Sequence, residues 1–357
     1  MKKYLMWPWV VLIVFILSGC SQPLPAVDTE ATQNSDIFQE TTAATVPNTS
    51  LEPTSQASEE EDLGSLGLSV YKENPNAPPP EIHYEGGEMS IKFALKGYGR
   101  AGRNGVGILL FLDGRPQPYR LEGDTDYQYM HRFTLDNEMI YPVFYFTPVT
   151  GQAGDTLEMA ALTIPYPDYL PSKENPRMVT GTNGSFGLSF PLQIDEAPVE
   201  TKMPEKLTLL SEPEITYEPC APQDVLGWEN DDFQIKYGHE SEVNGMTNGL
   251  NVFENFHKEA LDLKYSLWGT TLVHYTVVYF LNNEPLYLPD GSCLDLEVQE
   301  GMKTVARLTM DTSTLTGEDV VYAVLVPRNA RFTTPKTDAF VVGERQWFLL
   351  AGENPNK

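Results

Sequence analysis

The sequence IKFALKG at residues 91–97 places an apolar residue at every second position, and it recurs as LKYSLWG at residues 263–269. Ile91, Phe93 and Leu95 alternate with Lys92 and Lys96, which is the period of a β-strand with one buried face. The same alternation in the later stretch predicts a second, similar strand. The two stretches therefore predict a strand that occurs twice in the chain.

Three further pairs of short blocks follow in the same order and support a duplication. They are FLDGRP at 111–116 with FLNNEP at 280–285, RFTLD at 132–136 with RLTMD at 307–311, and YPV at 141–143 with YAV at 322–324. Because the four pairs keep their order along the chain, we interpret them as traces of one repeated domain. The third pair places an arginine, a threonine and an aspartate on one strand face in each copy, which predicts cross-strand charge pairing.

Each copy also contains a continuously apolar run that ends in a turn signal. The runs are residues 108–112 and 277–281, and they are followed by Asp113-Gly114 and Asn282-Asn283. A continuously apolar strand is typical of one that is covered on both faces. The residue pairs after the runs tolerate the positive φ angles of a tight hairpin turn. Both copies therefore predict a buried strand that leads into a hairpin.

Many short strands between turn residues predict an all-β chain with two tandem β-sandwich domains. We expect the first domain at 81–195, a linker at 196–213, the second domain at 214–350 and a tail at 351–357. Residues 252–261 are the one stretch with a short helical pattern. The pattern resembles immunoglobulin-like domains, although neither copy has the Cys…Trp…Cys spacing of antibody domains. That resemblance implies a fold and no particular ligand.

The N-terminus predicts secretion and lipid attachment. Lys2 and Lys3 precede an apolar run that ends near Leu17, the pattern of a secretory signal, and the run is short for a membrane-spanning helix. The stretch LSGC at 17–20 resembles the lipobox of bacterial lipoproteins. The resemblance implies cleavage after residue 19 and fatty acylation of Cys20. We therefore expect residues 1–19 to be a signal peptide and the mature chain to be anchored on the extracytoplasmic face of a membrane.

Residues 20–80 differ in composition from the rest of the chain. Between residues 21 and 80 the sequence has ten acidic residues and one basic residue, Lys72, with few aromatic residues. Such a segment buries too little apolar surface to offset its ordering entropy, so we expect a disordered acidic tether. A long tether suits a domain that stands clear of the bilayer within a thick wall, which favours a Gram-positive source.

The charge of the chain limits its partners. The formal net charge is −26, and removing the leader with Lys2 and Lys3 leaves 22 basic and 50 acidic residues. So acidic a surface repels phosphate backbones, so we expect no nucleic-acid partner. The acidic surface also repels anionic headgroups, so the lipid on Cys20 must provide the membrane contact. No motif predicts a cofactor.

The three cysteines divide into one anchor and two others. With Cys20 acylated, Cys220 and Cys293 remain on the extracytoplasmic side, where disulfides form. The sequence leaves open whether they form a bridge or are two separate buried thiols, since it does not show their distance.

The best local candidate for a partner contact is a glycine-rich loop with four nearby arginines. The loop at 97–102 matches G-x-G-x-x-G, but it leads into a strand rather than a helix, which favours a hairpin loop over a dinucleotide site. The loop is three residues longer than its counterpart in the second copy. We expect an anionic ligand or partner to contact the following arginines: Arg100, Arg103, Arg115 and Arg120.

Other polar pairs suggest catalysis or ion binding less specifically. Asp295 and Glu297 lie two residues apart on one strand face, as paired acids of glycan-cleaving enzymes do. Asp124 with Asp126, and Asp231 with Asp232, offer oxygen ligands for calcium, but no EF-hand loop is present. The five histidines lack the spacing of a metal site. Residues 141–146 supply aromatic rings for sugar stacking, although core packing is the better explanation of such a strand.

We expect a non-catalytic surface lipoprotein that acts in binding or adhesion, or as an accessory subunit of an envelope complex with a protein or cell-envelope partner. Two alternatives stay open. One is an envelope enzyme that acts on glycans with paired carboxylates, and the other is a solute-binding lipoprotein of a transporter.

Overall fold

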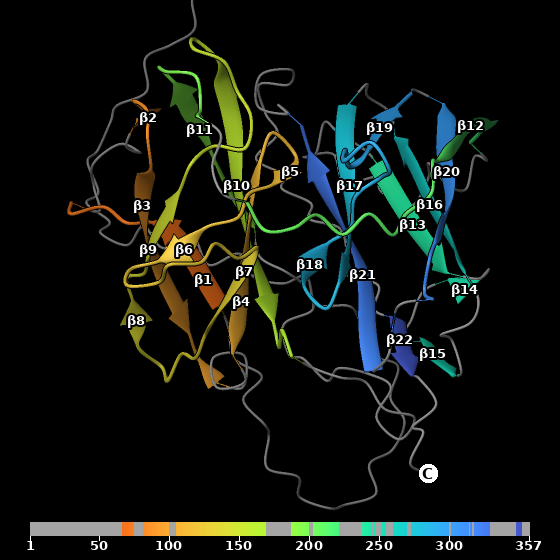
Figure 1. The fold of residues 1–357 in the computed structure, drawn as a ribbon, viewed down its shortest axis with the longest axis horizontal. Helices are drawn as coiled ribbons and strands as arrows, with labels where there is room; N and C mark the ends of the chain where they lie inside the picture. Colours follow the sequence, from red (N-terminus) through yellow and green to blue (C-terminus); the bar gives the residue numbers. More distant parts are fainter. Residues whose placement is uncertain are drawn as a thin grey trace, which may run out of the picture. The chain divides into compact units, whose positions relative to one another are not determined.

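The structure, a computed structural model, is an all-β arrangement of two β-sandwiches (Figure 1). It describes residues 66–74, 81–99, 105–168, 187–199, 203–220, 237–243, 246–247, 251–254, 260–269, 273–299, 301–313, 315, 318–328 and 348–351. Within these ranges no helix is long and apolar enough to cross a membrane. The named elements of the described residues are all strands, so the all-β prediction is confirmed.

The first sandwich has one five-stranded and one six-stranded sheet. The five-stranded sheet has the order β1-β3-β9-β6, with β8 also paired to β3, and the six-stranded sheet has the order β2-β11-β10-β4-β5, with β7 also paired to β4. The strands are β1 Leu66–Val70, β2 Ile82–Tyr84, β3 Met89–Gly97, β4 Val106–Leu112, β5 Arg115–Pro116, β6 Arg120–Leu121, β7 Met130–Phe133, β8 Met139–Ile140, β9 Val143–Phe146, β10 Thr156–Pro165 and β11 Gly187–Ile194.

The second sandwich has the same division. Its five-stranded sheet has the order β12-β20-β16-β13-β14, and its six-stranded sheet has the order β15-β22-β21-β17-β18, with β19 also paired to β17. The strands are β12 Glu214–Pro219, β13 Tyr237–Val243, β14 Met246–Thr247, β15 Asn251–Glu254, β16 Leu261–Gly269, β17 Val273–Leu281, β18 Glu284–Pro285, β19 Leu294–Val298, β20 Met302–Met310, β21 Glu318–Pro327 and β22 Phe348–Ala351.

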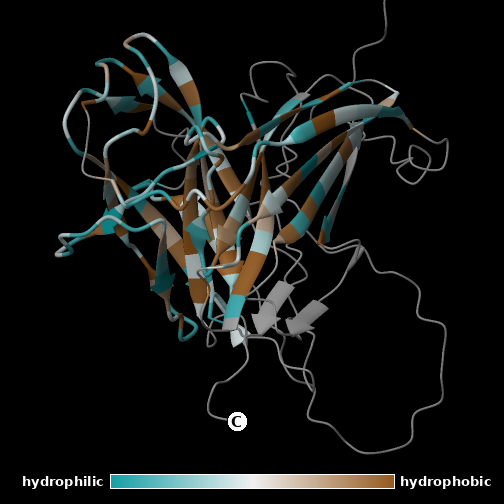
Figure 2. Cartoon of the chain, turned by 45° about the vertical axis from the view of Figure 1, so that its right-hand side comes forward, coloured by the Kyte–Doolittle hydropathy of each residue, from teal (hydrophilic) through white to brown (hydrophobic). Residues whose placement is uncertain are grey.

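Alternation along the strands builds each core. In β3, Ile91, Phe93 and Leu95 are at most 4% exposed, and they face inward between the two sheets. The equivalent residues of β16, Leu263, Tyr265 and Leu267, are buried in the second core. Figure 2 shows hydrophobic residues along the strands and hydrophilic residues mainly in the loops. The prediction from 91–97 and 263–269 is confirmed.

A third apolar cluster joins the six-stranded sheets of the two sandwiches. It contains the outward-facing residues of β4 and β10 together with those of β17 and β21. Its largest members are Phe111, Phe280 and Tyr322, and all three are buried. This cluster explains why residues 108–112 and 277–281 are apolar without alternation, because one set of side chains faces a sandwich core and the other faces the neighbouring sheet.

The duplication is confirmed for two of the four block pairs. The bridges Phe111↔Pro116 and Phe280↔Pro285 occupy the same place in the β4–β5 and β17–β18 hairpins. Asp113 and Gly114 at the first turn, and Asn282 and Asn283 at the second, all have the positive φ that the sequence predicts.

The other two block pairs were matched wrongly. Arg132 lies on β7, which pairs with β4, whereas Arg307 lies on β20, which pairs with β16 in the other layer. Tyr141 lies between β8 and β9, whereas Tyr322 lies on β21, the counterpart of β10. Short alternating blocks resemble any half-buried strand, so they do not identify which strand they form. Of the predicted charge pairs, Arg307 contacts Glu218 on the neighbouring strand β12, whereas Arg132 contacts Asp168, which lies beyond the end of β10. Thr134 and Asp136 lie beyond the end of β7, so the prediction that they share a strand face with Arg132 is wrong.

The predicted domain limits also need correction. β1 lies within the expected tether, yet it pairs with β3 from Leu66↔Gly97 to Val70↔Phe93, so the first sandwich includes residues before 81. The expected linker packs on the second sandwich, because Leu207 bridges to Leu286 and Leu210 is buried in its core.

The prediction of a helix at 252–261 is wrong at both ends of that stretch, where the structure has strands. Asn251–Glu254 forms β15, which runs parallel to β22, and Leu261 begins β16. A strand that pairs with a partner almost a hundred residues later leaves little local pattern to detect.

Candidate functional site

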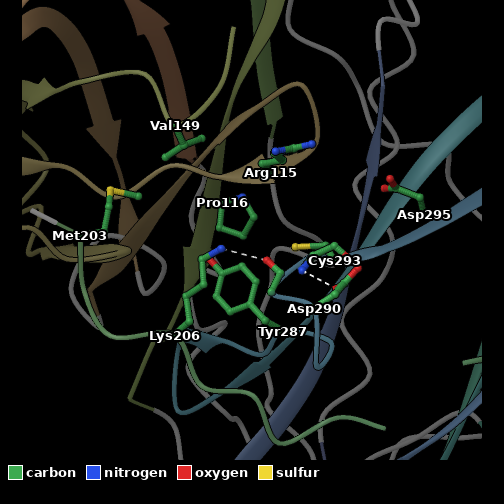
Figure 3. A pocket seen from close by; sticks show the side chains of 11 residues that line it. Arg115, Pro116, Val149, Met203, Lys206, Tyr287, Asp290, Cys293 and Asp295 are labelled. Atoms are coloured by element: carbon green, nitrogen blue, oxygen red, sulfur yellow. Dashed lines mark hydrogen bonds between the residues drawn. The ribbon is translucent and has the colours of Figure 1, made fainter. Parts of the chain in front are cut away.

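A cavity of about 440 Å³ lies where the linker, the first sandwich and the β18–β19 loop meet (Figure 3). Its lining residues are Arg115, Pro116 and Val149 from the first sandwich, Met203 and Lys206 from the linker, and Tyr287, Asp290, Gly291, Ser292, Cys293 and Asp295 from the second sandwich. The size is in the range of small-ligand sites. The wall mixes two cations, two carboxylates and an aromatic ring.

Most polar groups of the cavity wall fix the β18–β19 loop in place. Lys206 Nζ donates a hydrogen bond to the Gly291 carbonyl at 2.9 Å, and it lies 4.7 Å from the ring centroid of Tyr287. The Ser292 amide donates to Asp290 Oδ1 at 2.8 Å. A hydrogen bond from the Ser292 hydroxyl, together with this amide bond, lowers the pKa of Asp290. The Tyr287 hydroxyl donates to the Tyr129 hydroxyl of the first sandwich at 3.0 Å. These groups are therefore already used within the protein.

Asp295, one of the two predicted catalytic acids, belongs to a contact between the sandwiches. Arg328 donates to Asp295 Oδ2 at 2.8 Å and to Asp113 Oδ2 of the first sandwich at 3.1 Å. The Thr276 hydroxyl donates to Asp295 Oδ1 at 2.7 Å. Glu297 does share the strand face with Asp295, since the residues between and beside them are buried. Both oxygens of Asp295 nevertheless accept bonds that stabilise the fold.

Arg115 and Arg120, the two predicted arginines that the structure describes, lie in different sheets. Arg115 lies on β5 and lines the cavity, where it is exposed. Arg120 lies on β6 in the other sheet and pairs with Glu88 at 2.5 Å. Hydrogen bonds from Arg120 and Tyr127 lower the pKa of Glu88. Arg100 and Arg103 lie outside the described residues.

Cys220 and Cys293 are free thiols in this structure, and both are partly exposed. Cys220 follows β12, and its amide donates to the Gly301 carbonyl at 3.0 Å. Cys293 packs against the apolar cluster between the sandwiches, and burial raises the pKa of its thiol to about 12. Cys20 lies outside the described residues.

The predicted aromatic strand divides between core and surface. Phe144 and Phe146 are fully buried in the first core, whereas Tyr141 is 47% exposed and Tyr145 is partly exposed on the outer face of the sheet. Lys92 Nζ lies 5.5 Å from the ring centroid of Tyr141, and the Arg120 guanidinium lies 4.5 Å from that of Tyr145. Part of the strand therefore does offer aromatic rings to the solvent.

The remaining candidates do not converge. In the described residues no group of three or more histidine, cysteine, aspartate or glutamate side chains is placed to hold a metal ion. Asp124 lies 3.7 Å from His131, and Asp126 is exposed. Asp231 and Asp232 lie outside the described residues.

Sequence reasoning missed the residues that complete both surfaces. Lys206 and Tyr287 in the cavity carry no motif, and only the folding of the linker onto the second sandwich brings them together. Tyr71 was assigned to the tether, although β1 positions it beside Lys92. The signal available in the sequence was the alternation of the LGLSV stretch at 66–70.

Comparison with known proteins gives only slight likenesses. No known protein family matches the chain, and no curated protein matches it. A Corynebacterium diphtheriae protein described as membrane anchored aligns at 11% identity with a TM-score of 0.21, over 80% of this chain and 59% of that structure. The C-terminal domain of the AgI/II polypeptide BspA of Streptococcus agalactiae aligns at 9% identity with a TM-score of 0.18, over 80% of this chain and all of that domain.

CBD12 from CALX1.2 aligns at 9% identity with a TM-score of 0.16, over 76% of this chain and 96% of that structure. The chain thus spans less than two thirds of the Corynebacterium structure. At these values no property transfers from any of the three to this chain.

Proposed function

We propose that this chain is a bacterial lipoprotein that is anchored through Cys20 on the extracytoplasmic face of the membrane and acts as a non-catalytic binding module. The location rests on the lysines, the apolar run and the LSGC stretch at the N-terminus. The acidic tether would set the two sandwiches away from the bilayer.

The observation that favours binding over catalysis is the position of Asp295. A glycan-cleaving pair needs one protonated and one ionised carboxyl group facing the substrate. Here Asp295 accepts from Arg328 and Thr276, and Arg328 also pairs with Asp113. An acid used in this way stabilises the contact between the sandwiches, which supports a non-catalytic role for the module.

Fatty-acid labelling of the full chain in a bacterial host tests the anchor. Cells are grown with an alkyne-bearing palmitate analogue, and the protein is followed through membrane and soluble fractions. We expect label and membrane association in the wild type, and loss of both in Cys20→Ala. Cys220→Ala is the matched control, and it should keep both. A wild-type chain without label would overturn the anchor.

The binding role is tested by crosslinking in intact cells followed by mass spectrometry. We expect a defined envelope component to be captured by the lipidated protein and not by an unrelated lipoprotein of similar abundance. Hydrolysis of isolated wall fragments by the wild type, with loss of that hydrolysis in Asp295→Asn, would instead support the enzyme.

A further inference from the structure

The outer face of the five-stranded sheet in the first sandwich combines lysines with tyrosines. We call it the tyrosine–lysine face, and it consists of Tyr71, Lys92, Lys96, Tyr98, Tyr141 and Tyr145. The residues come from β3, from the segments that follow β1, β3 and β8, and from β9, so the sheet itself sets their spacing. Tyr98 is 38% exposed and Tyr141 is 47% exposed, so both rings are open to solvent.

The lysines of this face lie over aromatic rings. Lys92 Nζ is 4.2 Å from the ring centroid of Tyr71, and Lys96 Nζ is 4.5 Å from that of Tyr98. Tyr71 and Tyr141 contact each other edge to face at 5.1 Å. Cation–π contacts stabilise this arrangement but leave the positive charge of each lysine uncompensated. Neither Lys92 nor Lys96 forms an ion pair within the described residues.

The second sandwich serves as an internal comparison. Lys264 is the counterpart of Lys92, and its neighbour across the strand pair is Glu242, with which it forms an ion pair. At the corresponding place in the first sandwich, Tyr71 is the neighbour of Lys92.

Glu240 is a second acid of the second sandwich that has no acidic counterpart in the first sandwich. Lys303 lies 4.8 Å from the ring centroid of Trp268, but Glu240 lies 3.5 Å from its ammonium group. The residue of β1 that corresponds to Glu240 is Ser69, since Ser69 pairs with Ala94 as Glu240 pairs with Ser266. One copy of the fold thus neutralises its outer lysines, and the other surrounds them with rings and a serine.

These groups fit a chain of acidic sugars. A sugar ring presents an apolar face of C–H groups that stacks on a tyrosine ring, while its hydroxyl groups stay in water. Lysine ammonium groups attract the carboxylate or phosphate groups that such sugars carry. Glu88 lies near Tyr145, but its carboxylate pairs with Arg120, whose guanidinium lies 4.5 Å from the Tyr145 ring centroid. Charges more than about 8 Å from the face are screened at physiological ionic strength.

We infer that the tyrosine–lysine face binds an acidic polysaccharide by stacking sugar rings on its tyrosines and pairing sugar anions with Lys92 and Lys96. The inference rests on the proposed binding function and names its ligand class. A flat, open sheet face favours an extended polymer over a small enclosed ligand.

The test uses full-length lipidated protein in detergent and two forms of one polymer. Polygalacturonate carries a carboxylate on each sugar, and methyl esterification removes the charge while keeping the sugar. By calorimetry we expect binding of polygalacturonate and at least about tenfold weaker binding of the ester. Polyglutamate, which has the charge without the sugar ring, should also bind about tenfold more weakly.

Variants locate the site. Lys92→Gln with Lys96→Gln, and separately Tyr141→Ala, should each weaken polygalacturonate binding about tenfold, with thermal unfolding unchanged. Lys264→Gln is the matched control in the second sandwich, and it should leave binding unchanged.

Absence of polygalacturonate binding would overturn the inference, as would equal binding of polyglutamate, which would indicate an acidic protein partner. Equal loss in Lys264→Gln would place the site elsewhere. Failure of this inference is distinct from failure of the proposed function, because fatty-acid labelling and cellular crosslinking report on the latter with the same protein.

Discussion

Phe111 of the first sandwich contacts Phe280, its counterpart in the second, with ring centroids 6.3 Å apart and ring planes at 89°. Contact between two equivalent residues is the mark of a local twofold axis. Leu109 and Val278, each two residues earlier, lie in the same cluster. Met130, which begins β7, and Cys293, which directly precedes β19, pack at its margin. The sandwiches therefore meet through the same positions of both copies.

Phe111→Ala and Phe280→Ala should each lower the free energy of unfolding by about 3–5 kcal/mol, because both rings are buried. The double variant should cost less than the sum by about 0.5–1.5 kcal/mol, since the rings contact each other. Urea unfolding measures all three. Additive losses would contradict the contact, and the surface variant Tyr141→Ala should change the free energy by no more than about 0.5 kcal/mol.

Gly114 allows the β4–β5 turn to approach the second sandwich. A Cβ atom on Gly114 would lie 2.4 Å from the Thr276 hydroxyl and 2.9 Å from Cγ of Arg328. Gly87 has a similar positive φ but open space around it. Gly114→Ala should therefore cost about 1–3 kcal/mol more than Gly87→Ala, which carries the backbone strain alone. Equal melting temperatures for the two variants would contradict this close approach.

His131 should make stability fall in acid. Burial lowers its pKa below the ordinary value of 6.5, although its ring contacts the Tyr119 carbonyl at 2.9 Å. As the pH falls below 6.5, the unfolded chain gains a proton on this residue that the folded chain resists, so folding stability is lost. Urea unfolding at pH 8 and pH 5 should show a smaller acid loss in His131→Gln than in the wild type.

His83 provides a control with the opposite sign. Its hydrogen bond with Asp195 at 2.8 Å raises its pKa, so its contribution is present below pH 6.5 and is lost as the pH rises through the raised value. His83→Gln should therefore lose stability mainly in acid. If both variants changed the pH dependence in the same direction, the burial of His131 would be wrong.

Cys293 should resist alkylation in the folded protein. Its thiol pKa is raised to about 12 by burial, with Asp295 adding to the effect, so the thiolate is scarce at pH 8. Iodoacetamide labelling of the Cys220→Ser variant, followed by mass spectrometry, should be at least about tenfold slower in buffer than in urea. Equal rates in the two conditions would show that the thiol is accessible.

Local pattern was sufficient for some elements and insufficient for others. The strand at 91–97 and the turn at Asp113-Gly114 are determined by alternation and by positive φ, both of which are visible in a few residues. β1 was missed because its five residues follow an acidic segment and acquire a buried face only by pairing with β3. The helix expected near Val252 failed for a similar reason, since β15 depends on the distant β22.

The candidate site was less predictable than the fold. Arg115 was identified, but its companion Lys206 comes from a segment that sequence composition marks only as a linker. The tyrosine–lysine face depends on strand register, which brings Tyr71 beside Lys92. Register follows from pairing over long distances in sequence, and one chain alone does not reveal it.

The local twofold contact has a consequence for the outer surfaces of the two copies. A single sandwich with this apolar sheet would be self-complementary and would pair with another copy as a homodimer. Fusion of two copies makes that pairing independent of protein concentration, and it also allows the two copies to differ in sequence. Any substitution in a homodimer appears on both sides at once. In this chain, Glu242 beside Lys264 and Tyr71 beside Lys92 coexist, so the two copies present different outer surfaces, which an assembly of identical chains does not allow.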